Sequence, residues 1–380
     1  MCRVLIILML FLSVLPGLCA RDWNFRMIYP CTRAPKSPDM ACPNHGTVHL
    51  TFSDKEIRYA PLDSEEIKFV SLGRGNSPSL AVDSQNRPSI AYKAGSQLTF
   101  ARFYNSEWVT EDVKTEYGFL NFSHSIESTG TPLILAFVYD GPTWGQQFLF
   151  KTEPKILART ESGWAVQSTG LSAVNCDGQP VLDRNDSFHF SDSNTDTGML
   201  SHACIGAAEN RLDNIVVTRD FTPDYCLDAA GNFHICFCDL DLDRDLRYST
   251  KVDGRWQIEK IPATRPSTHK RILTDPAGNP CILFINYRDA EAPQMVEEST
   301  RIGQELLKTS KPAPNTFHAD LILAERNNGQ WKLDTVASLL AEGDMELTSP
   351  FCLAACFDTR GQLHVVFFDE KQGGLIYGVK

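Results

Sequence analysis

Short runs of alternating hydrophobic and polar residues, separated by glycine, asparagine or aspartate, follow one another along most of this chain. The clearest example lies between Pro223 and Pro262, where four such runs span residues 223–228, 233–239, 245–251 and 255–262. Their β-branched, aromatic and sulfur-containing residues, with turn residues between them, predict a four-stranded antiparallel meander. One small sheet cannot cover both its faces and protect its edges, so neighbouring sheets must do so.

The first two strands of this unit recur along the chain, each copy placing a turn between two hydrophobic runs. The seven copies are residues 44–52, 78–92, 126–137, 182–190, 223–237, 273–284 and 356–368. The third strand recurs at residues 57–60, 98–102, 246–249 and 375–378, and a tryptophan marks the fourth strand at Trp108, Trp164, Trp256 and Trp331. Self-similarity at this spacing predicts an array of repeated sheets.

The two ends of the chain complement each other. The last copy stops at Lys380 with no fourth strand, whereas residues 22–28 have the composition of a fourth strand and precede the first hairpin. We therefore expect the N-terminal strand to join the last sheet and close a ring, which removes exposed edges. The predicted fold is an all-β, seven-bladed β-propeller of four-stranded antiparallel blades, with six blades as the alternative if residues 44–52 are too irregular to count.

Residues 1–20 have the pattern of a cleaved secretory signal: one early arginine, an apolar run from Val4 to Leu18 and a small-residue exit. We expect residues 21–380 to form a single propeller domain that is secreted or extracytoplasmic, periplasmic in a Gram-negative source. No later apolar run is long enough to span a membrane. The net charge of −11 argues against a nucleic-acid partner, and we expect a monomer.

The two faces of the predicted disc differ in their loops. Connections between strands 1 and 2 are tight turns, whereas the opposite face carries long insertions at residues 139–155 and 287–320. In the second insertion, Met295, Ile302 and Leu306 form one stripe and predict a short helix. Because binding sites are built on loops of rigid scaffolds, we expect the site on this long-loop face.

Trp144 lies between glycines and a proline in the first insertion, so its indole can stack on a sugar or anchor a protein partner. Tyr139 and Asp140 precede it and complete the predicted ligand site. In the loop 191–198, Asp192, Asn194 and Asp196 alternate as calcium ligands do, although no acidic residue closes the loop. A solvated acidic rim is the preferred interpretation; we expect no cofactor, with calcium as the alternative.

The repeat pattern resembles that of sialidase-like, BNR-type secreted propellers, and the resemblance covers nearly the whole chain after residue 20. It implies a sialidase motif near the N-terminus, but residues 25–30 read F-R-M-I-Y-P, with extra residues, and no intact S-x-D-x-G-x-x-W box occurs. Similar secreted propellers include polysaccharide lyases, which use histidine, tyrosine and arginine. That resemblance implies five candidate catalytic residues: His124, His269, Arg271, Tyr287 and Arg288.

Two functions stay open at this point. One is a glycan-binding or glycan-processing propeller, for which a polysaccharide lyase or glycoside hydrolase fits the sequence better than a sialidase. The other is a non-enzymatic propeller that binds an extracellular protein. His49, His234 and His364 occupy one position of the second strand in different copies, and we interpret them as structural.

Ten of the twelve cysteines follow the predicted signal. Cys31 and Cys42 lie in a proline-rich segment, and in an oxidising compartment they are the predicted disulfide. Most of the others fall within predicted strands and read as small buried hydrophobic residues. No paired C-x-x-C spacing of a zinc site is present.

Overall fold

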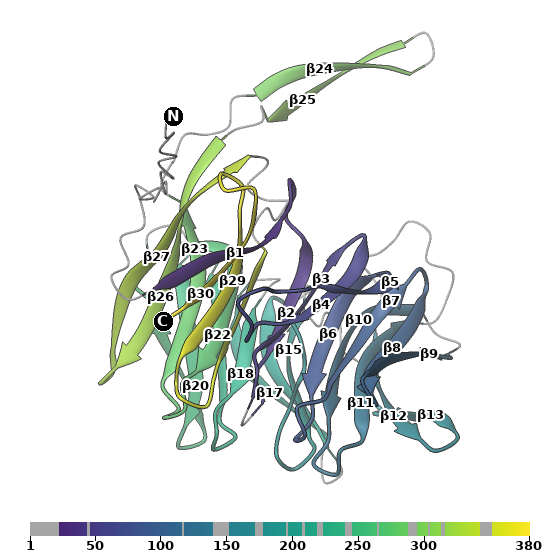
Figure 1. The fold of residues 1–380 in the computed structure, drawn as a ribbon. Coiled ribbons are helices and arrows are strands. Elements are labelled where there is room, and N and C mark those ends of the chain that lie inside the picture. Colours follow the sequence, from purple (N-terminus) through teal and green to yellow (C-terminus); the bar gives the residue numbers. More distant parts are fainter. Residues whose placement is uncertain are drawn as a thin grey trace, which may run out of the picture.

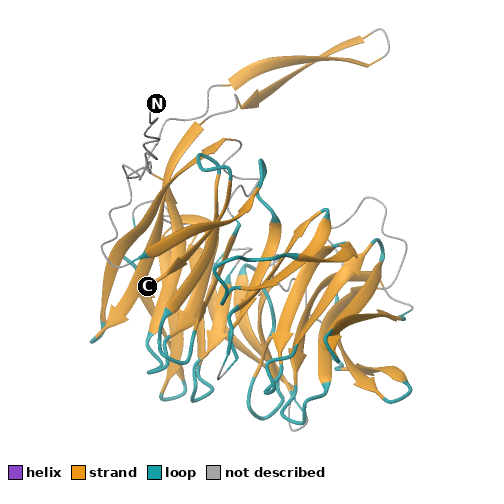
Figure 2. Ribbon diagram, in the orientation of Figure 1, coloured by secondary structure: helices purple, strands orange, loops and turns teal. Residues whose placement is uncertain are grey.

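The chain forms a disc of four-stranded antiparallel sheets arranged around a central axis, as seen in a computed structural model (Figure 1). The residues described are 23–43, 46–115, 118–139, 152–171, 178–194, 197–206, 210–218, 223–239, 245–263, 266–287, 295–302, 305–312, 316–342 and 352–380. Within these ranges all regular structure is strand, and no helix occurs (Figure 2). The prediction of an all-β propeller with seven blades is confirmed.

Each blade runs from an inner strand at the axis to an outer strand at the rim. The first three blades are β2–β5 (Lys36–Ala41, His49–Asp54, Glu56–Pro61, Val70–Arg74), β6–β9 (Asn76–Val82, Pro88–Ala94, Gln97–Tyr104, Glu107–Val113) and β10–β13 (Gly118–Ile126, Pro132–Tyr139, Glu153–Thr160, Gly163–Ser168). The next two are β14–β17 (Val181–Leu182, Phe188–Asn194, Met199–Ile205, Asn210–Val217) and β18–β21 (Asp224–Leu227, Phe233–Asp239, Asp245–Val252, Arg255–Lys260). The sixth blade is β22 (Pro266–Thr274), β23 (Pro280–Tyr287), β26 (Thr316–Asn327) and β27 (Gln330–Glu342).

The seventh blade joins the two ends of the chain. Its inner three strands are β28 (Leu353–Phe357), β29 (Leu363–Asp369) and β30 (Gly374–Val379), and its outer strand is β1 (Asn24–Pro30). β1 pairs antiparallel with β30, with Phe25 opposite Gly378, and the Trp23 ring stacks on Phe25 with centroids 5.6 Å apart. The predicted closure by the N-terminal strand is confirmed, two residues further along than the sequence suggested.

The predicted helix in the insertion is wrong. Met295–Ile302 and Glu305–Pro312 are the strands β24 and β25 of a hairpin inserted between β23 and β26, and Figure 1 shows this hairpin extending away from the disc. β-Branched residues such as Val296, Thr300 and Ile302 favour an extended backbone because their χ1 angles are restricted in a helix. The helix prediction rested on the spacing of hydrophobic residues alone and did not take this preference into account.

Hydrophobic residues fill the spaces between neighbouring blades, and the fourth-strand tryptophans take part in this packing. Trp108 lies edge-on to Tyr59 of the preceding blade with ring centroids 4.9 Å apart, and Trp331 packs in the same way on Tyr248, at 5.3 Å. Trp164 contacts Phe100 of the preceding blade at 5.2 Å. The tryptophans therefore join blades, as their recurrence in register suggested.

Two of these tryptophans are each anchored by a glutamate of the preceding blade. Glu111 accepts a hydrogen bond from Trp164 Nε1 (3.0 Å) and two from the Arg159 guanidinium (2.6 and 3.0 Å). Glu259 repeats the arrangement with Trp331 (3.1 Å) and Arg326 (3.0 and 2.7 Å). Paired hydrogen bonds between guanidinium and carboxylate fix orientation as well as distance, so they set the angle between blades.

We predict that the closure depends on the absence of a side chain at Gly378. A Cβ added there would overlap the Phe25 ring and lie 3.2 Å from Val365 Cγ1. Gly378→Ala should therefore lower the free energy of unfolding by about 1–3 kcal/mol, measured by urea denaturation. Adding Phe25→Leu should recover part of this loss because it removes the overlapping atoms. Strictly additive effects of the two substitutions would contradict this account.

Candidate functional site

The inner segment of each blade is the stretch of chain at the axis that contains or precedes its first strand. One equivalent position in every inner segment lies four residues before the first residue of the turn between strands 1 and 2. The seven residues at this position are Asp39, Ser79, Ser123, Gln179, Asp224, Arg271 and Ala354. Most of them are polar although they lie at the axis of the disc. A buried polar side chain needs hydrogen-bonding partners, and these residues find theirs in the neighbouring blade.

Five of the side chains at this position link their inner segment to the next one around the axis. The contacts are Leu80 N–H to Asp39 Oδ2 (2.7 Å), His124 N–H to Ser79 Oγ (2.9 Å), Ser123 Oγ–H to the Pro180 carbonyl (2.9 Å), Ile272 N–H to Asp224 Oδ2 (2.7 Å) and Arg271 Nε–H to the Leu353 carbonyl (3.4 Å). Five of the seven pairs of neighbouring blades are joined in this way, from the first to the fourth blade and from the fifth to the seventh.

Charged side chains meet across the axis at this level. Arg271 Nη1 lies 3.1 Å from Asp224 Oδ1, and Asp39 of the first blade interacts with both Arg271 and Gln179. Burial raises the pKa of Asp39 to about 6, although the Leu80 N–H and the Arg271 guanidinium act in the opposite direction. Because carboxylates already occupy its guanidinium, Arg271 holds the axis together rather than presenting a free cation.

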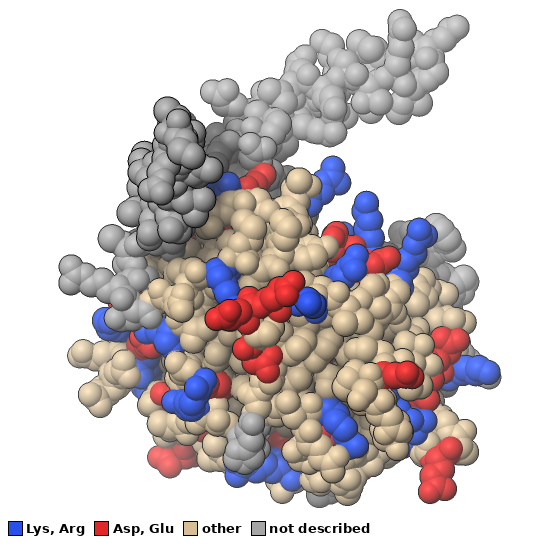
Figure 3. All heavy atoms as spheres, in the orientation of Figure 1, with Lys and Arg blue, Asp and Glu red and all other residues tan. Residues whose placement is uncertain are grey.

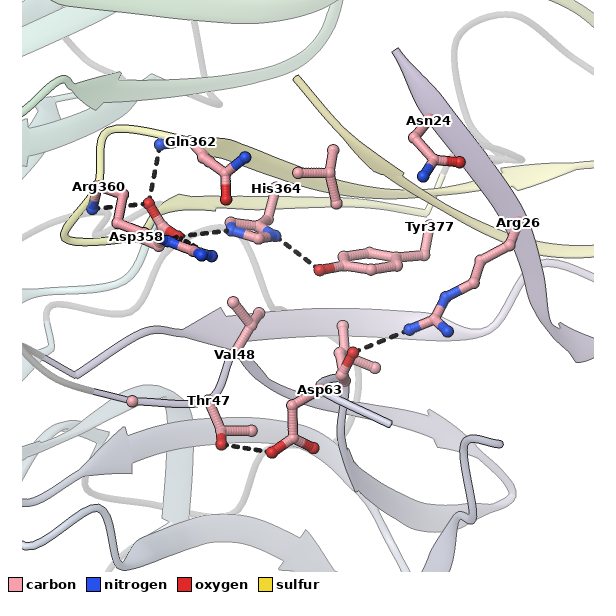
Figure 4. Close-up of a pocket in the computed structure, with 13 residues that line it drawn as sticks. Asn24, Arg26, Thr47, Val48, Asp63, Asp358, Arg360, Gln362, His364 and Tyr377 are labelled. Atoms are coloured by element: carbon pink, nitrogen blue, oxygen red, sulfur yellow. Dashed lines mark hydrogen bonds and ion pairs between the residues drawn. The ribbon is translucent and has the colours of Figure 1, made fainter. Parts of the chain in front are cut away.

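A cavity of about 380 Å³ lies between the seventh and first blades, and we call it the seam pocket (Figure 4). It opens on the face that carries the short turns, beside the turn from Asp358 to Gln362. The lining residues are Asn24, Arg26, Gly46, Thr47, Val48, Leu62, Asp63, Asp358, Arg360, Gln362, His364, Tyr377 and Val379. Since β1, β29 and β30 supply part of this lining, ring closure creates the pocket.

Two contacts hold the first-blade wall of the pocket. Arg26 of β1 crosses the seam and donates hydrogen bonds to the carbonyls of Leu62 and Ser64, both at 2.9 Å, and its guanidinium lies 5.4 Å from the centre of the Tyr377 ring. Thr47 Oγ1 donates to Asp63 Oδ2 (2.7 Å), as Figure 4 shows. Both walls are therefore polar and oriented by hydrogen bonds.

The seventh-blade wall contains a chain of three side chains. Tyr377 Oη and His364 Nδ1 are 2.6 Å apart, and His364 Nε2 lies 3.6 Å from Asp358 Oδ2. Burial lowers the pKa of His364 despite the nearby carboxylate, and burial also raises the pKa of Tyr377 to about 12. Burial alone would raise the pKa of Asp358, but hydrogen bonds from Gln362 and Arg360 hold it below its usual value.

This arrangement recurs elsewhere, which identifies it as part of the scaffold. In the fifth blade His234 Nδ1 lies 2.6 Å from Tyr248 Oη, and His234 Nε2 lies 3.4 Å from Asp228 Oδ2. In the first blade His49 Nδ1 lies 2.6 Å from Tyr59 Oη. The interpretation of these histidines as hydrogen-bonded structural residues is confirmed. His189 adds a fourth example, in which His202 (2.9 Å) takes the place of the tyrosine.

The five candidate catalytic residues do not form one described constellation. His124 lies between the second and third blades, where Ser89 Oγ (2.7 Å) and the Leu133 carbonyl (3.1 Å) engage both ring nitrogens, and burial lowers its pKa to about 4. His269 and Arg271 lie on β22 of the sixth blade, and burial together with Lys270 and Arg271 lowers the pKa of His269. The side chain of Tyr287 and all of Arg288 lie outside the described residues.

Much of the predicted ligand site also lies outside the described residues, including Asp140, Trp144, Asp196 and the side chains of Tyr139 and Asn194. Part of the segment 191–198, interpreted as an acidic rim with calcium binding as the alternative, is strand, because Ser191–Asn194 belong to β15 and Asp192 is buried opposite Ser201. Within the described ranges, no group of three or more metal-ligating side chains could hold a metal ion. Those ranges also contain no helix long and apolar enough to cross a membrane.

The sequence predicted neither the polar axis nor the seam pocket. Counting four residues back from the turn aspartates Asp83, Asp228 and Asp275 would have found Ser79, Asp224 and Arg271. No comparable signal marks the pocket, because its walls come from opposite ends of the chain.

On the side of the disc visible in Figure 3, acidic and basic side chains are interspersed among larger uncharged areas.

We predict that the charge on Asp39 makes stability depend on pH. Its pKa in the folded chain, about 6, exceeds the unfolded value of about 4, so its contribution to stability is full below pH 4 and is lost as the pH rises through 6. The stability of Asp39→Asn relative to wild type should therefore rise by about 2 kcal/mol from pH 4 to pH 8, measured by urea unfolding. The exposed control Asp112→Asn should show no such trend, and a constant difference for Asp39→Asn would refute the account.

No protein-family profile and no curated protein sequence matches the chain. Among solved structures, an oligogalacturonate lyase in complex with manganese is similar over 94% of this chain and 96% of its own, with a TM-score of 0.58 and 11% identity. AofleA from Arthrobotrys oligospora has a TM-score of 0.47 at 10% identity, covering 86% of this chain and 94% of its own. A K499G mutant of NanB sialidase from Streptococcus pneumoniae has a TM-score of 0.43 at 10% identity, covering 93% of this chain and 70% of its own. The similarity to the lyase structure shows a shared propeller fold.

Proposed function

We propose that this chain is a secreted glycan-binding propeller and that the seam pocket holds a short saccharide without cleaving it. The observation that carries the proposal is the lining of the pocket, where amide, carboxylate and guanidinium groups surround one cavity. Its volume lies in the range of small-molecule sites. The oligogalacturonate lyase that shares the fold is named for a saccharide substrate, which supports a saccharide as the ligand class.

The lining suits sugar hydroxyl groups, which both donate and accept hydrogen bonds. The side-chain amides of Asn24 and Gln362 offer donors and acceptors. Arg360, whose side chain is 75% exposed and whose Nε and Nη2 bind Asp358, offers its remaining donors. Asp63 offers carboxylate oxygens to accept from a hydroxyl. Figure 4 shows these groups on facing walls, with Asn24, Arg360 and Gln362 on the seventh-blade side and Asp63 on the first-blade side.

Binding is favoured over cleavage because the titratable groups of the pocket are engaged in structural contacts. Asp358 accepts hydrogen bonds from the backbone N–H groups of Arg360 (2.9 Å) and Gln362 (2.8 Å), and His364 is buried against Tyr377. A general acid or base needs a pKa near the working pH. Burial moves the pKa of His364 and that of Tyr377 away from neutrality.

The long-loop face stays a predicted second contact surface. Trp144, Tyr139 and Asp140 are its predicted ligand residues, and cleavage by a lyase or hydrolase there would need His269, Arg271, Tyr287 or Arg288. Secretion through residues 1–20 is likewise part of the proposal. The two faces can be tested separately, because the seam pocket lies beside the short turns and Trp144 lies in a long-loop insertion.

The β24–β25 hairpin favours protein binding as a second candidate function. It extends beyond the disc in Figure 1, and a two-stranded hairpin by itself is only marginally stable in water. Both of its edges offer backbone groups to which a partner strand could add. Deleting residues 295–312 should abolish binding to such a partner and leave saccharide binding intact.

We predict that Gln362→Ala weakens saccharide binding about three- to tenfold, because it removes neutral hydrogen bonds and leaves the backbone of the turn unchanged. Glycan-array screening of the full chain would identify the ligand, and titration calorimetry would measure its affinity. The exposed control Gln97→Ala, on the second blade, should bind like wild type.

Trp144→Ala separates the two faces in the same assay. Loss of binding in Trp144→Ala alone would move the site to the long-loop face and refute the pocket. Absence of any saccharide ligand on the array would refute the proposed function itself.

A further inference from the structure

Four cysteines gather where the ring closes. Of the nine cysteines in the described part of the chain, Cys31, Cys42, Cys352 and Cys356 belong to one hydrophobic cluster between the seventh and first blades. Cys352 and Cys356 are buried, whereas Cys31 and Cys42 are half-buried at the edge of the cluster. All four are free thiols in the structure.

The Cys31–Cys42 disulfide that the sequence predicts is not formed, and geometry explains why. Cys31 precedes β2 and Cys42 follows it, so the whole of Lys36–Ala41 lies between them. Six strand residues at about 3.3 Å each span about 20 Å, whereas a disulfide joins Cα atoms less than about 7 Å apart. The proline-rich segment that looked irregular in the sequence is therefore partly the innermost strand of a blade.

Each N-terminal cysteine lies at the same end of the seam as one C-terminal cysteine. Inner strands β2 and β28 are in contact across the seam. Cys31 and Cys352 both precede these strands, whereas Cys42 immediately follows β2 and Cys356 lies near the end of β28. Parallel neighbouring strands place equivalent ends together, so the four cysteines sort into two pairs.

Electrostatic contacts agree with this sorting. Burial raises the pKa of the Cys352 thiol, and the neighbouring Cys31 thiol adds to the effect. Burial likewise raises the pKa of the Cys356 thiol well above its usual value, and Cys42 is the next contributor. Each buried thiol therefore lies within electrostatic range of the half-buried thiol at its own end of the seam.

We propose that oxidation links Cys31 to Cys352 and Cys42 to Cys356, so that two disulfides fasten the first blade to the seventh. Each bond encloses several hundred residues of chain, which is the case in which a cross-link restricts the unfolded state most. The seventh blade combines β1 with three strands from the other end of the chain, which hydrogen bonds and packing hold together, so a covalent link from the β1–β2 segment to β28 fastens the two ends.

A disulfide such as oxidised glutathione can drive each step. The half-buried thiolate, Cys31 or Cys42, attacks one glutathione sulfur and releases a glutathione thiolate, which leaves a mixed disulfide. The buried partner, Cys352 or Cys356, loses its proton, attacks the protein sulfur of that mixed disulfide and releases the second glutathione. Per bond, two protein thiols lose two protons and two electrons, and one glutathione disulfide becomes two thiols.

Peptide mapping tests the pairing directly. The folded chain without residues 1–20 is incubated with oxidised glutathione, alkylated with iodoacetamide and digested without reduction for mass spectrometry. We expect one peptide pair linked through Cys31 and Cys352, and another through Cys42 and Cys356. A Cys31–Cys42 link, or four alkylated thiols after full equilibration, would overturn the proposal.

Thermal unfolding tests the consequence. We expect the oxidised chain to melt about 5–10 °C above the chain reduced with dithiothreitol. The double variant Cys31→Ala/Cys42→Ala should lose this difference, whereas the control Cys236→Ala, at a buried cysteine of the fifth blade, should keep it even if it melts lower overall. An oxidation-dependent shift that survives in the double variant would refute the assignment. Saccharide binding does not enter either readout, so this proposal stands or falls independently of the function.

Discussion

The hydrogen bonds between neighbouring inner segments are the constraint on which this fold depends. Seven sheets meet at one axis, where short polar residues such as Ser79 and Asp224 bridge directly to the next backbone. Ser79 and Asp224 each satisfy a buried N–H group of the next blade, whereas Ser123 and Arg271 donate to carbonyl groups. The blades therefore support one another at the axis, while aromatic contacts such as Tyr248–Trp331 set their spacing nearer the rim.

The seam between the seventh and first blades differs from the other blade junctions because the seventh blade is built from both ends of the chain. β1 completes the last sheet before the chain continues into β2 of the first blade, and Arg26 on β1 reaches the carbonyls of the first blade. A seam made from the two chain ends leaves a cavity lined by both. The proposed ligand site and the proposed cross-links thus have one origin, since both arise where the ring has to be closed.

The repeats along the chain allowed the fold to be predicted, but the segments that do not follow the repeat were predicted wrongly. Trp256 and His234 looked functional in isolation, but their recurrence identified them as scaffold, and the Tyr248 contact of His234 bears this out. The insertion around Met295 has no second copy, so its stripe of hydrophobic residues was interpreted alone and gave a helix where a hairpin forms. The segment from Cys31 to Cys42 was interpreted wrongly for a different reason, because its proline content concealed an inner strand.

The sequence by itself determined the number of blades, most of the strands within them and the use of the N-terminal strand as closure, because these follow from local alternation and repeated turns. Only the tertiary structure decided which distant residues meet. Asp39 and Arg271 share the axis, Asp63 and Asp358 share a pocket, and Cys31 lies at the end of the seam occupied by Cys352. Such pairs are separated by most of the chain, and no local pattern encodes a contact that exists only after the ring has closed.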